Sequence, residues 1–188
     1  MTLFDALTAY TPYNEQEARD KQQFLSLLTS GQELYTRENT LAHLTASSWV
    51  VSPDRSQVLL IYHNIYASWA WMGGHADGDR DLLAVALRET REESGLEALR
   101  LLTPEIFSLE TLTVDGHVKR GAYVSSHLHL NVTYLLEADP GLPLRVKPDE
   151  NSGVRWFPLR EVPKAVSEKW MREHIYSKLM DKVRSVGI

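Results

Sequence analysis

Three glutamates on one predicted helix are the residues of this sequence best suited to chemistry. Glu89, Glu92 and Glu93 are spaced i, i+3 and i+4, so on a helix their carboxylates share a face. Like charges at this spacing destabilise a helix by about 0.2–0.5 kcal/mol per pair, and a divalent cation among them would relieve the repulsion. Mg²⁺ suits such a site because it prefers carboxylate oxygens. The alternative is an ordinary charged helix at the surface.

Clear start and stop signals bound the helix that carries these glutamates. Residues 82–94 contain neither Gly nor Pro. Asp81 can cap the N-terminus, and Gly95 stands where a helix end favours a residue that adopts positive φ. We therefore predict a helix over residues 82–94.

A glycine-rich loop runs directly into this helix. Its glycines at 73, 74 and 78 permit a tight turn and close approach of the backbone to a ligand. Loop and helix together resemble the signature of the Nudix hydrolases: a glycine, five residues, a glutamate, seven residues, then Arg-Glu-aliphatic-x-Glu-Glu-x-Gly-aliphatic. Here the same spacing places Gly74, Arg80 and the segment Arg-Glu-Thr-Arg-Glu-Glu-Ser-Gly-Leu at 88–96.

Two positions depart from that signature. Arg80 stands where the family has its first glutamate, which the resemblance implies braces the loop against the arginine that is Arg88 here. Asp79 or Asp81 can substitute for it. Thr90 replaces an aliphatic residue; it is close to valine in shape and costs little packing, but its hydroxyl needs a partner if it is buried.

The resemblance covers about residues 41–160 and implies an α/β (α+β) sandwich, a mixed sheet with helices on its faces. It also implies hydrolysis of a diphosphate bond, in a nucleoside diphosphate linked to another group, by attack of water on phosphorus. Mg²⁺ or Mn²⁺ would be held by Glu89, Glu92 and Glu93. Glu150 stands six residues before Trp156, where several Nudix enzymes have a loop acid that reaches the metal. Alternatively, Glu150 only turns the chain.

The resemblance also suggests individual roles. Glu93 is our first choice as inner metal ligand, and Arg88 would orient a glutamate and not touch the substrate. Glu150 and His129 are alternative general bases. The predicted catalytic residues are Glu93, Glu92, Glu150 and Arg88. The predicted substrate-binding residues are Gly74, His75, Trp71 and His129.

Two other functions are compatible with this fold. An isomerase of the isopentenyl diphosphate type is set aside, since that chemistry requires a catalytic cysteine and the chain has none. A ligand sensor that has kept the fold and lost turnover is the remaining alternative, although a complete set of three glutamates would then have little use.

The elements that must position the site follow from hydrophobic periodicity. We predict an N-terminal helical extension over 1–40 and a hydrolase domain over 41–188, together one compact unit. Pro12 is expected to exclude an earlier helix, and Asn14 and Glu17 to form a capping box for a helix to about Ser30. The other predicted elements are a hairpin over 44–63, strands over 106–114 and 127–136 joined by a turn at Asp115-Gly116, a short strand over 154–157, and a helix from Ser167 to Val186 after breaks at Pro158 and Pro163.

Two faces have open interpretations. One or two of Tyr66, Trp69 and Trp71 can stack on a flat group of the substrate, or all three can be core. On the strand 127–136 the polar residues His127, His129, Asn131 and Thr133 alternate with apolar ones, so this face either meets solvent or lines the substrate cleft. His127-x-His129 alone is weak evidence for zinc, because no third nitrogen ligand stands at a telling spacing.

Composition narrows the class of protein. The absence of cysteine excludes disulfides and thiolate metal sites, and a net charge of −5 gives no basic surface for nucleic acid or anionic membranes. No apolar run approaches the ~18 residues of a membrane span, and the N-terminus resembles neither a signal nor a transit peptide. We expect a cytoplasmic enzyme with a small-molecule diphosphate substrate, with homodimerisation open.

Overall fold

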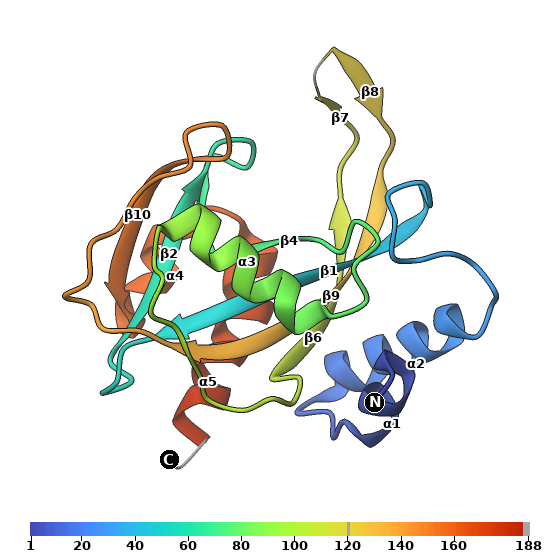
Figure 1. Cartoon of the computed structure of the whole chain (residues 1–188), viewed down its shortest axis with the longest axis horizontal. Helices are drawn as coiled ribbons and strands as arrows, with labels where there is room; N and C mark the ends of the chain where they lie inside the picture. The colour runs from blue at the N-terminus through green and yellow to red at the C-terminus, as the bar shows by residue number, and fades with distance from the viewer. Residues whose placement is uncertain (120, 186–188) are drawn as a thin grey trace.

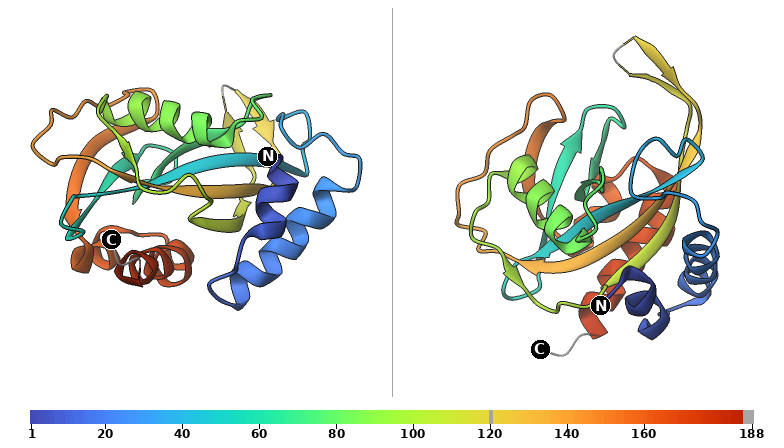
Figure 2. Two further views of the ribbon diagram at one scale, coloured as in Figure 1. Left: turned by 60° about the horizontal axis from the view of Figure 1, so that its bottom comes forward. Right: turned by 45° about the vertical axis from the view of Figure 1, so that its right-hand side comes forward.

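The computed structural model describes residues 1–119 and 121–185, which form an α/β sandwich around one mixed sheet (Figure 1). Helix α3 lies across one face of the sheet, and α5 lies on the opposite face (Figure 2). The predicted fold class is therefore confirmed. The helices are α1 Leu3–Ala9, α2 Glu15–Leu28, α3 Leu82–Ser94, α4 Val162–Ala165 and α5 Ser177–Ser185. The strands are β1 Ala42–Val51, β2 Gln57–His63, β3 Ser68–Ala70, β4 Met72–His75, β5 Arg100–Leu101, β6 Ser108–Val114, β7 His117–Lys119, β8 Ala122–Val124, β9 His127–Glu137 and β10 Asn151–Pro158.

Strand β1 is the centre of the sheet. It runs parallel to β9 over its whole length, from the pair Ala42–Leu128 to the pair Val51–Glu137. It is antiparallel to β2 and β4, while β6 pairs with the other edge of β9. All ten residues of β1 are buried because both faces of the strand are covered. This strand therefore fixes the positions of the glycine strand β4 and of β9.

Helix α3 forms where the sequence predicts it. The Asp81 carboxylate accepts a hydrogen bond from the Ala84 amide at 3.0 Å, and Gly95 ends the helix at φ 76°. Thr90 is fully buried, and its hydroxyl donates to the Ala86 carbonyl at 2.7 Å and lies beside the Ser48 hydroxyl. The buried hydroxyl thus has the partners that its burial requires.

The N-terminal segment differs from the prediction in two respects. A short helix, α1, precedes Pro12, because Thr2 and Asp5 form a capping box two turns earlier. The Asn14 side chain caps α2 by accepting from the Glu17 amide. The Glu17 carboxylate does not complete that box; it turns into the interior, where its side chain is 0% exposed.

A buried polar network joins this segment to the rest of the molecule. The Glu17 carboxylate lies 3.1 Å from the Lys178 ammonium and 2.9 Å from that of Lys182, both on α5. Lys178 also pairs with Glu110 of β6 at 2.9 Å. Apolar residues of α1 and α2, including Leu7 and Phe24, pack in the same core cluster as Leu44 of β1. The N-terminal helices therefore share the core of the sheet.

Three connections also differ from the prediction. Asp115-Gly116 does not turn the chain back; the segment continues into the hairpin β7–β8, which projects beyond the sheet (Figure 1). Pro163 does not break a helix but occupies the first turn of α4, where a proline is tolerated. The final helix begins at Lys169, passes through a π-helical segment, Met171–Tyr176, and continues as α5; its predicted end at Val186 lies outside the described residues.

Within residues 1–119 and 121–185, none of the helices has both the length and the apolar character that crossing a membrane requires.

Candidate active site

The glycine strand β4 lies directly against the acidic face of α3. The Gly73 amide donates a hydrogen bond to Glu93 Oε2 at 2.9 Å, and the Glu93 side chain is buried. At Gly74 an added Cβ would lie 2.7 Å from Glu89 Oε1, closer than side chains approach one another. Gly74 is therefore required for the backbone to lie this close to Glu89, whereas a Cβ at Gly73 would meet Ser47 and the Ala46 carbonyl of β1.

Burial and neighbouring negative charges disfavour the ionised form of two carboxylates on this face. Burial, followed by the charges of Glu150 and Glu89, raises the pKa of Glu93 well above its usual range, although the Gly73 amide opposes the shift. Burial and the charge of Glu92 likewise raise the pKa of Glu89. A cation placed among these groups would be stabilised by them.

Arg88 connects the loop to the helix, in the way that the family resemblance implies for its arginine. Its guanidinium lies 3.5 Å from Asp79 Oδ2 and 3.3 Å from Glu89 Oε1. Asp79 therefore makes the contact expected of the missing first glutamate. Arg80 points away and lies 3.6 Å from Glu33, with its guanidinium over the Tyr35 ring. The acid that contacts Arg88 is thus Asp79, one residue before the signature position that Arg80 occupies.

Lys147 is a site residue that the sequence reasoning missed. Its ammonium lies 2.9 Å from Glu92 Oε2 and 3.0 Å from Glu150 Oε2, so it joins the helix to the loop before β10. Burial lowers the pKa of Lys147, but the hydrogen bonds and charges of the two glutamates outweigh that effect and raise it. Glu150 is thereby held beside the acidic face of α3. Glu150 is only three residues from Lys147, but the sequence does not show that the lysine also reaches Glu92, which lies in a distant segment.

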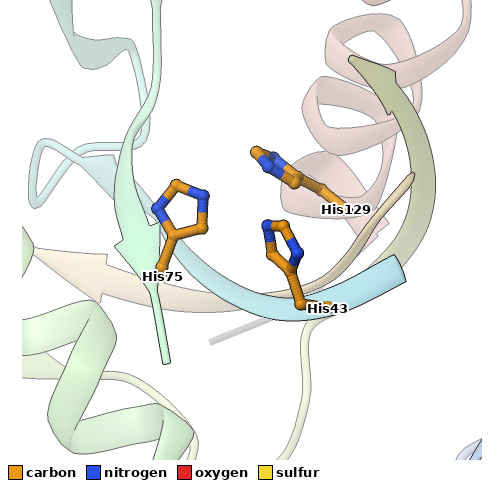
Figure 3. A group of neighbouring side chains, drawn as sticks. All are labelled: His43, His75 and His129. Carbon is orange, nitrogen blue, oxygen red and sulfur yellow. The ribbon is translucent and has the colours of Figure 1, made fainter. Parts of the chain in front are cut away.

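Beyond the glycine strand, a cavity of about 480 Å³ opens at the end of the sheet. His75 of β4, His129 of β9 and His43 of β1 line it, and their rings converge on a common space (Figure 3). Burial, and then the neighbouring imidazoles, lower the pKa of His129 to about 2. Two of the predicted substrate-binding residues, His75 and His129, are thus brought together, and His43 is an addition that the sequence reasoning missed.

The polar face of β9 was predicted either to meet solvent or to line the substrate cleft, and the structure divides it into two parts. His127 and His129 line the cavity, whereas Asn131 and Thr133 are buried. The Asn131 amide donates to Glu110 Oε2 at 3.0 Å and its oxygen accepts from the Ser47 hydroxyl at 2.8 Å. The two ends of this face therefore have different surroundings.

Arg37, from the N-terminal segment, is another residue that sequence reasoning missed. It lines the cavity and forms a two-pronged ion pair with Asp77 of the glycine loop, with Nε 2.6 Å from Oδ1. That hydrogen bond, opposed by burial, raises the pKa of Arg37, and the charges of Glu89 and Glu150 add to the shift. The charge of this guanidinium therefore interacts both with the acidic residues Glu89 and Glu150 and with the histidines His43 and His129.

The aromatic residues before the glycine strand divide into two groups. Tyr66 lines the cavity and stacks on His63 with ring centroids 4.3 Å apart. Trp71 does not line the cavity; its ring packs edge-on against Tyr176 at 5.4 Å, on the side covered by the C-terminal helix. Trp69 packs against Phe157 at 4.7 Å. Of the three rings, Tyr66 is the one placed to contact a cavity ligand.

A glycine strand thus lies against an acidic helix, within a mixed sheet that has helices on both of its faces (Figure 2). A family model described as NUDIX domain matches residues 42–178. The chain therefore belongs to the NUDIX family, and the resemblance drawn from the sequence is confirmed.

Solved structures share the fold at low sequence identity. A NUDIX-family hydrolase from Clostridium perfringens superimposes with a TM-score of 0.54 at 18% identity, covering 77% of this chain and 98% of that one. The Nudix hydrolase RenU from M. smegmatis gives 0.56 at 17%, covering 78% and 88%. The NUDIX domain of Shewanella oneidensis NrtR, complexed with ADP ribose, gives 0.52 at 18% and covers 98% of both chains. A search of curated proteins found no match.

Proposed function

We propose that this enzyme hydrolyses the diphosphate bond of a nucleoside diphosphate linked to a further group, and that it depends on Mg²⁺ or Mn²⁺. The observation that carries the proposal is the 2.9 Å hydrogen bond from the Gly73 amide to Glu93, which fixes a buried carboxylate directly beneath the glycine strand. The solved NUDIX domain bound to ADP ribose, a molecule of this substrate class, supports it.

The residues present suit a divalent cation. Glu89, Glu92 and Glu93 offer hard oxygen ligands, and the carboxylate set already attracts one cation, the Lys147 ammonium, to Glu92 and Glu150. A divalent cation held there would supply charge that offsets the phosphate oxygens and would promote ionisation of the attacking water. We assign Glu89, Glu92 and Glu93 as its ligands.

The chain's own residues divide the remaining tasks. Arg88 is a positioning residue, because its contacts to Asp79 and Glu89 fix the loop on the helix. Glu150 is better placed than His129 to accept the proton of the attacking water, because Lys147 holds Glu150 beside Glu92. Gly74 and His75 lie at the passage from the acidic face to the cavity, which would receive the rest of the substrate.

The first test is release of nucleoside monophosphate from ADP ribose, nucleotide sugars, dinucleoside polyphosphates and nucleoside triphosphates, with Mg²⁺ and with a chelator. We expect metal-dependent release, which Glu93→Gln lowers by about 10²-fold or more while the fold persists. The matched control is Glu97→Gln, at an exposed glutamate just beyond α3, which should keep wild-type activity. Wild-type turnover in Glu93→Gln would contradict the assignment. Binding of a panel member without turnover would support the alternative, a ligand sensor.

A further inference from the structure

Four imidazoles gather at the cavity end of the sheet. His43 and His129 are direct neighbours across the β1–β9 pair, and His75 lies on β4 along the other edge of β1 (Figure 3). One nitrogen from each of these three rings lies within 4.8 Å of the other two; across the described residues, no other set of three or more histidines and acids converges as closely. The glutamates of α3 do not converge in this way.

His127 adds a fourth nitrogen to the group. Its Nε2 lies 3.2 Å from Nε2 of His129, and its ring centroid lies 4.8 Å from that of His43. Two nitrogens bound to one tetrahedral zinc at 2.0–2.1 Å are about 3.3 Å apart. The two nitrogens, which in the absence of metal are at hydrogen-bond distance, are therefore spaced as two ligands of one ion would be.

Hydrogen bonds orient two of the rings as they are oriented in metal sites. His43 Nδ1 lies 3.0 Å from the Asn39 carbonyl, and His127 Nδ1 lies 2.8 Å from the Ser125 carbonyl. A ring that donates its Nδ1 hydrogen to a carbonyl presents a lone pair on Nε2. His43 Nε2 is buried and has no hydrogen-bond partner within the described part of the chain, which is unfavourable unless a ligand binds there.

The surroundings favour neutral rings. Burial lowers the pKa of both His43 and His129, and the neighbouring imidazoles lower that of His129 further. Neutral imidazole is the form that binds metal, and its borderline softness suits zinc, copper or nickel better than magnesium. Other charged groups facing the cluster are Arg37 and Asp77, which are paired with each other.

We propose that His43, His75 and His129, with His127 as fourth ligand, bind one transition-metal ion of the zinc class, separate from the acidic face of α3. The cavity of about 480 Å³ adjoins this group. An ion held there would add positive charge beside the predicted binding place of the substrate. This inference does not depend on which substrate the enzyme cleaves.

The test is titration of Zn²⁺ into the full chain, after metal removal, by calorimetry. We expect one Zn²⁺ per chain, retained when Glu89→Gln and Glu93→Gln remove the acidic ligands, and bound at least about 100-fold more weakly when His43→Gln and His129→Gln are combined. The matched control is His174→Gln, at an exposed histidine that packs against Trp170, which should leave Zn²⁺ binding unchanged. Circular dichroism checks that each variant is folded.

Co²⁺ provides a second readout that needs no variant. Bound to wild-type protein in place of Zn²⁺, it should give the strong visible absorption of a tetrahedral nitrogen site, since geometry and ligand type determine the spectrum. Either a weak octahedral spectrum, or Zn²⁺ binding that is lost with the glutamates and kept without the histidines, would overturn the proposal. So would absence of Zn²⁺ binding to the wild-type chain.

Discussion

Lys178 is the residue whose replacement should test the buried polar network most directly. Its side chain is 2% exposed, and its ammonium lies 2.9 Å from Glu110, 3.1 Å from Glu17 and 2.8 Å from the Gln16 side-chain oxygen. Lys178→Met keeps most of the aliphatic volume and removes the charge. Glu17 and Glu110, whose side chains are each 0% exposed, would then have less positive charge nearby to balance their buried negative charges.

The expected loss follows from which partners remain. Removing one member of a buried ion pair costs about 3–5 kcal/mol of unfolding free energy, because the other charge is left buried. Glu17 keeps Lys182 at 2.9 Å, whereas Glu110 loses the one ammonium found within 4 Å of it among the described residues. We therefore expect the lower end of that range, about 3 kcal/mol, or roughly 6–12 °C in Tm for a chain of this size.

Urea unfolding at pH 7, followed by circular dichroism, measures this loss. Lys169→Met is the matched control, since Lys169 is exposed, and its effect should stay within about 0.5 kcal/mol. A Lys178→Met variant within about 1 kcal/mol of wild type, with an unchanged denaturant slope, would refute the reasoning that the network stabilises the fold.

Three further predictions concern the site and its support. Gly74→Ala should lower kcat at least about tenfold with little loss of stability, because the new Cβ would displace the flexible Glu89 carboxylate. Gly73→Ala should instead cost about 1–3 kcal/mol of unfolding free energy, since its Cβ would meet the backbone carbonyl of Ala46 at 2.7 Å. Enzyme kinetics and urea unfolding of both variants separate the two effects. Lys147→Met should lower the Mg²⁺ concentration for half-maximal rate by up to about fivefold, because the Lys147 ammonium and Mg²⁺ would compete for Glu92. This factor is equivalent to the ~1 kcal/mol of a half-exposed ion pair. An unchanged Mg²⁺ requirement would contradict this competition. Burial raises the pKa of Glu17, but the charges of its two lysine partners outweigh burial and lower the pKa from 4.5 to about 2. The contribution of Glu17 to stability is therefore complete above pH 4.5 and is lost as the pH falls to 2. Glu17→Gln should be less stable at neutral pH, and its unfolding free energy should change less between pH 4.5 and pH 2.

Local signals were sufficient for the helix that carries the chemistry. Asp81 and Gly95 determine where α3 begins and ends, and both act on backbone groups within one turn of themselves. The prediction was wrong at α1, because it rested on Pro12 alone and did not consider the capping pair Thr2 and Asp5. A proline disfavours the helical conformation of the residue before it, not that of residues two turns upstream.

Sheet register explains why part of the site escaped prediction. A third histidine was sought near His127 and His129 in sequence, but the strand beside them is β1, which is parallel and far away along the chain. A signal was present nonetheless: polar and apolar residues alternate at the start of β1 as they do along β9. In the structure these alternations coincide, as the pairs His43–His129, Thr45–Asn131 and Ser47–Thr133. Matching alternation on two strands indicates a shared polar face before register is known.

That shared face links the cavity to the two ends of the chain. From the histidines it continues beneath the sheet through Asn131 and Thr133 to Glu110, whose carboxylate accepts hydrogen bonds from both at 3.0 and 3.1 Å. Glu110 then binds Lys178 of the C-terminal helix, which also binds Glu17 of the N-terminal extension. Because a buried polar row of this kind is stable only when all its members are satisfied, the extension and the C-terminal helix complete the sheet that holds the histidines. The N-terminal extension thus stabilises the sheet that carries the histidines and also contributes Arg37 to the cavity.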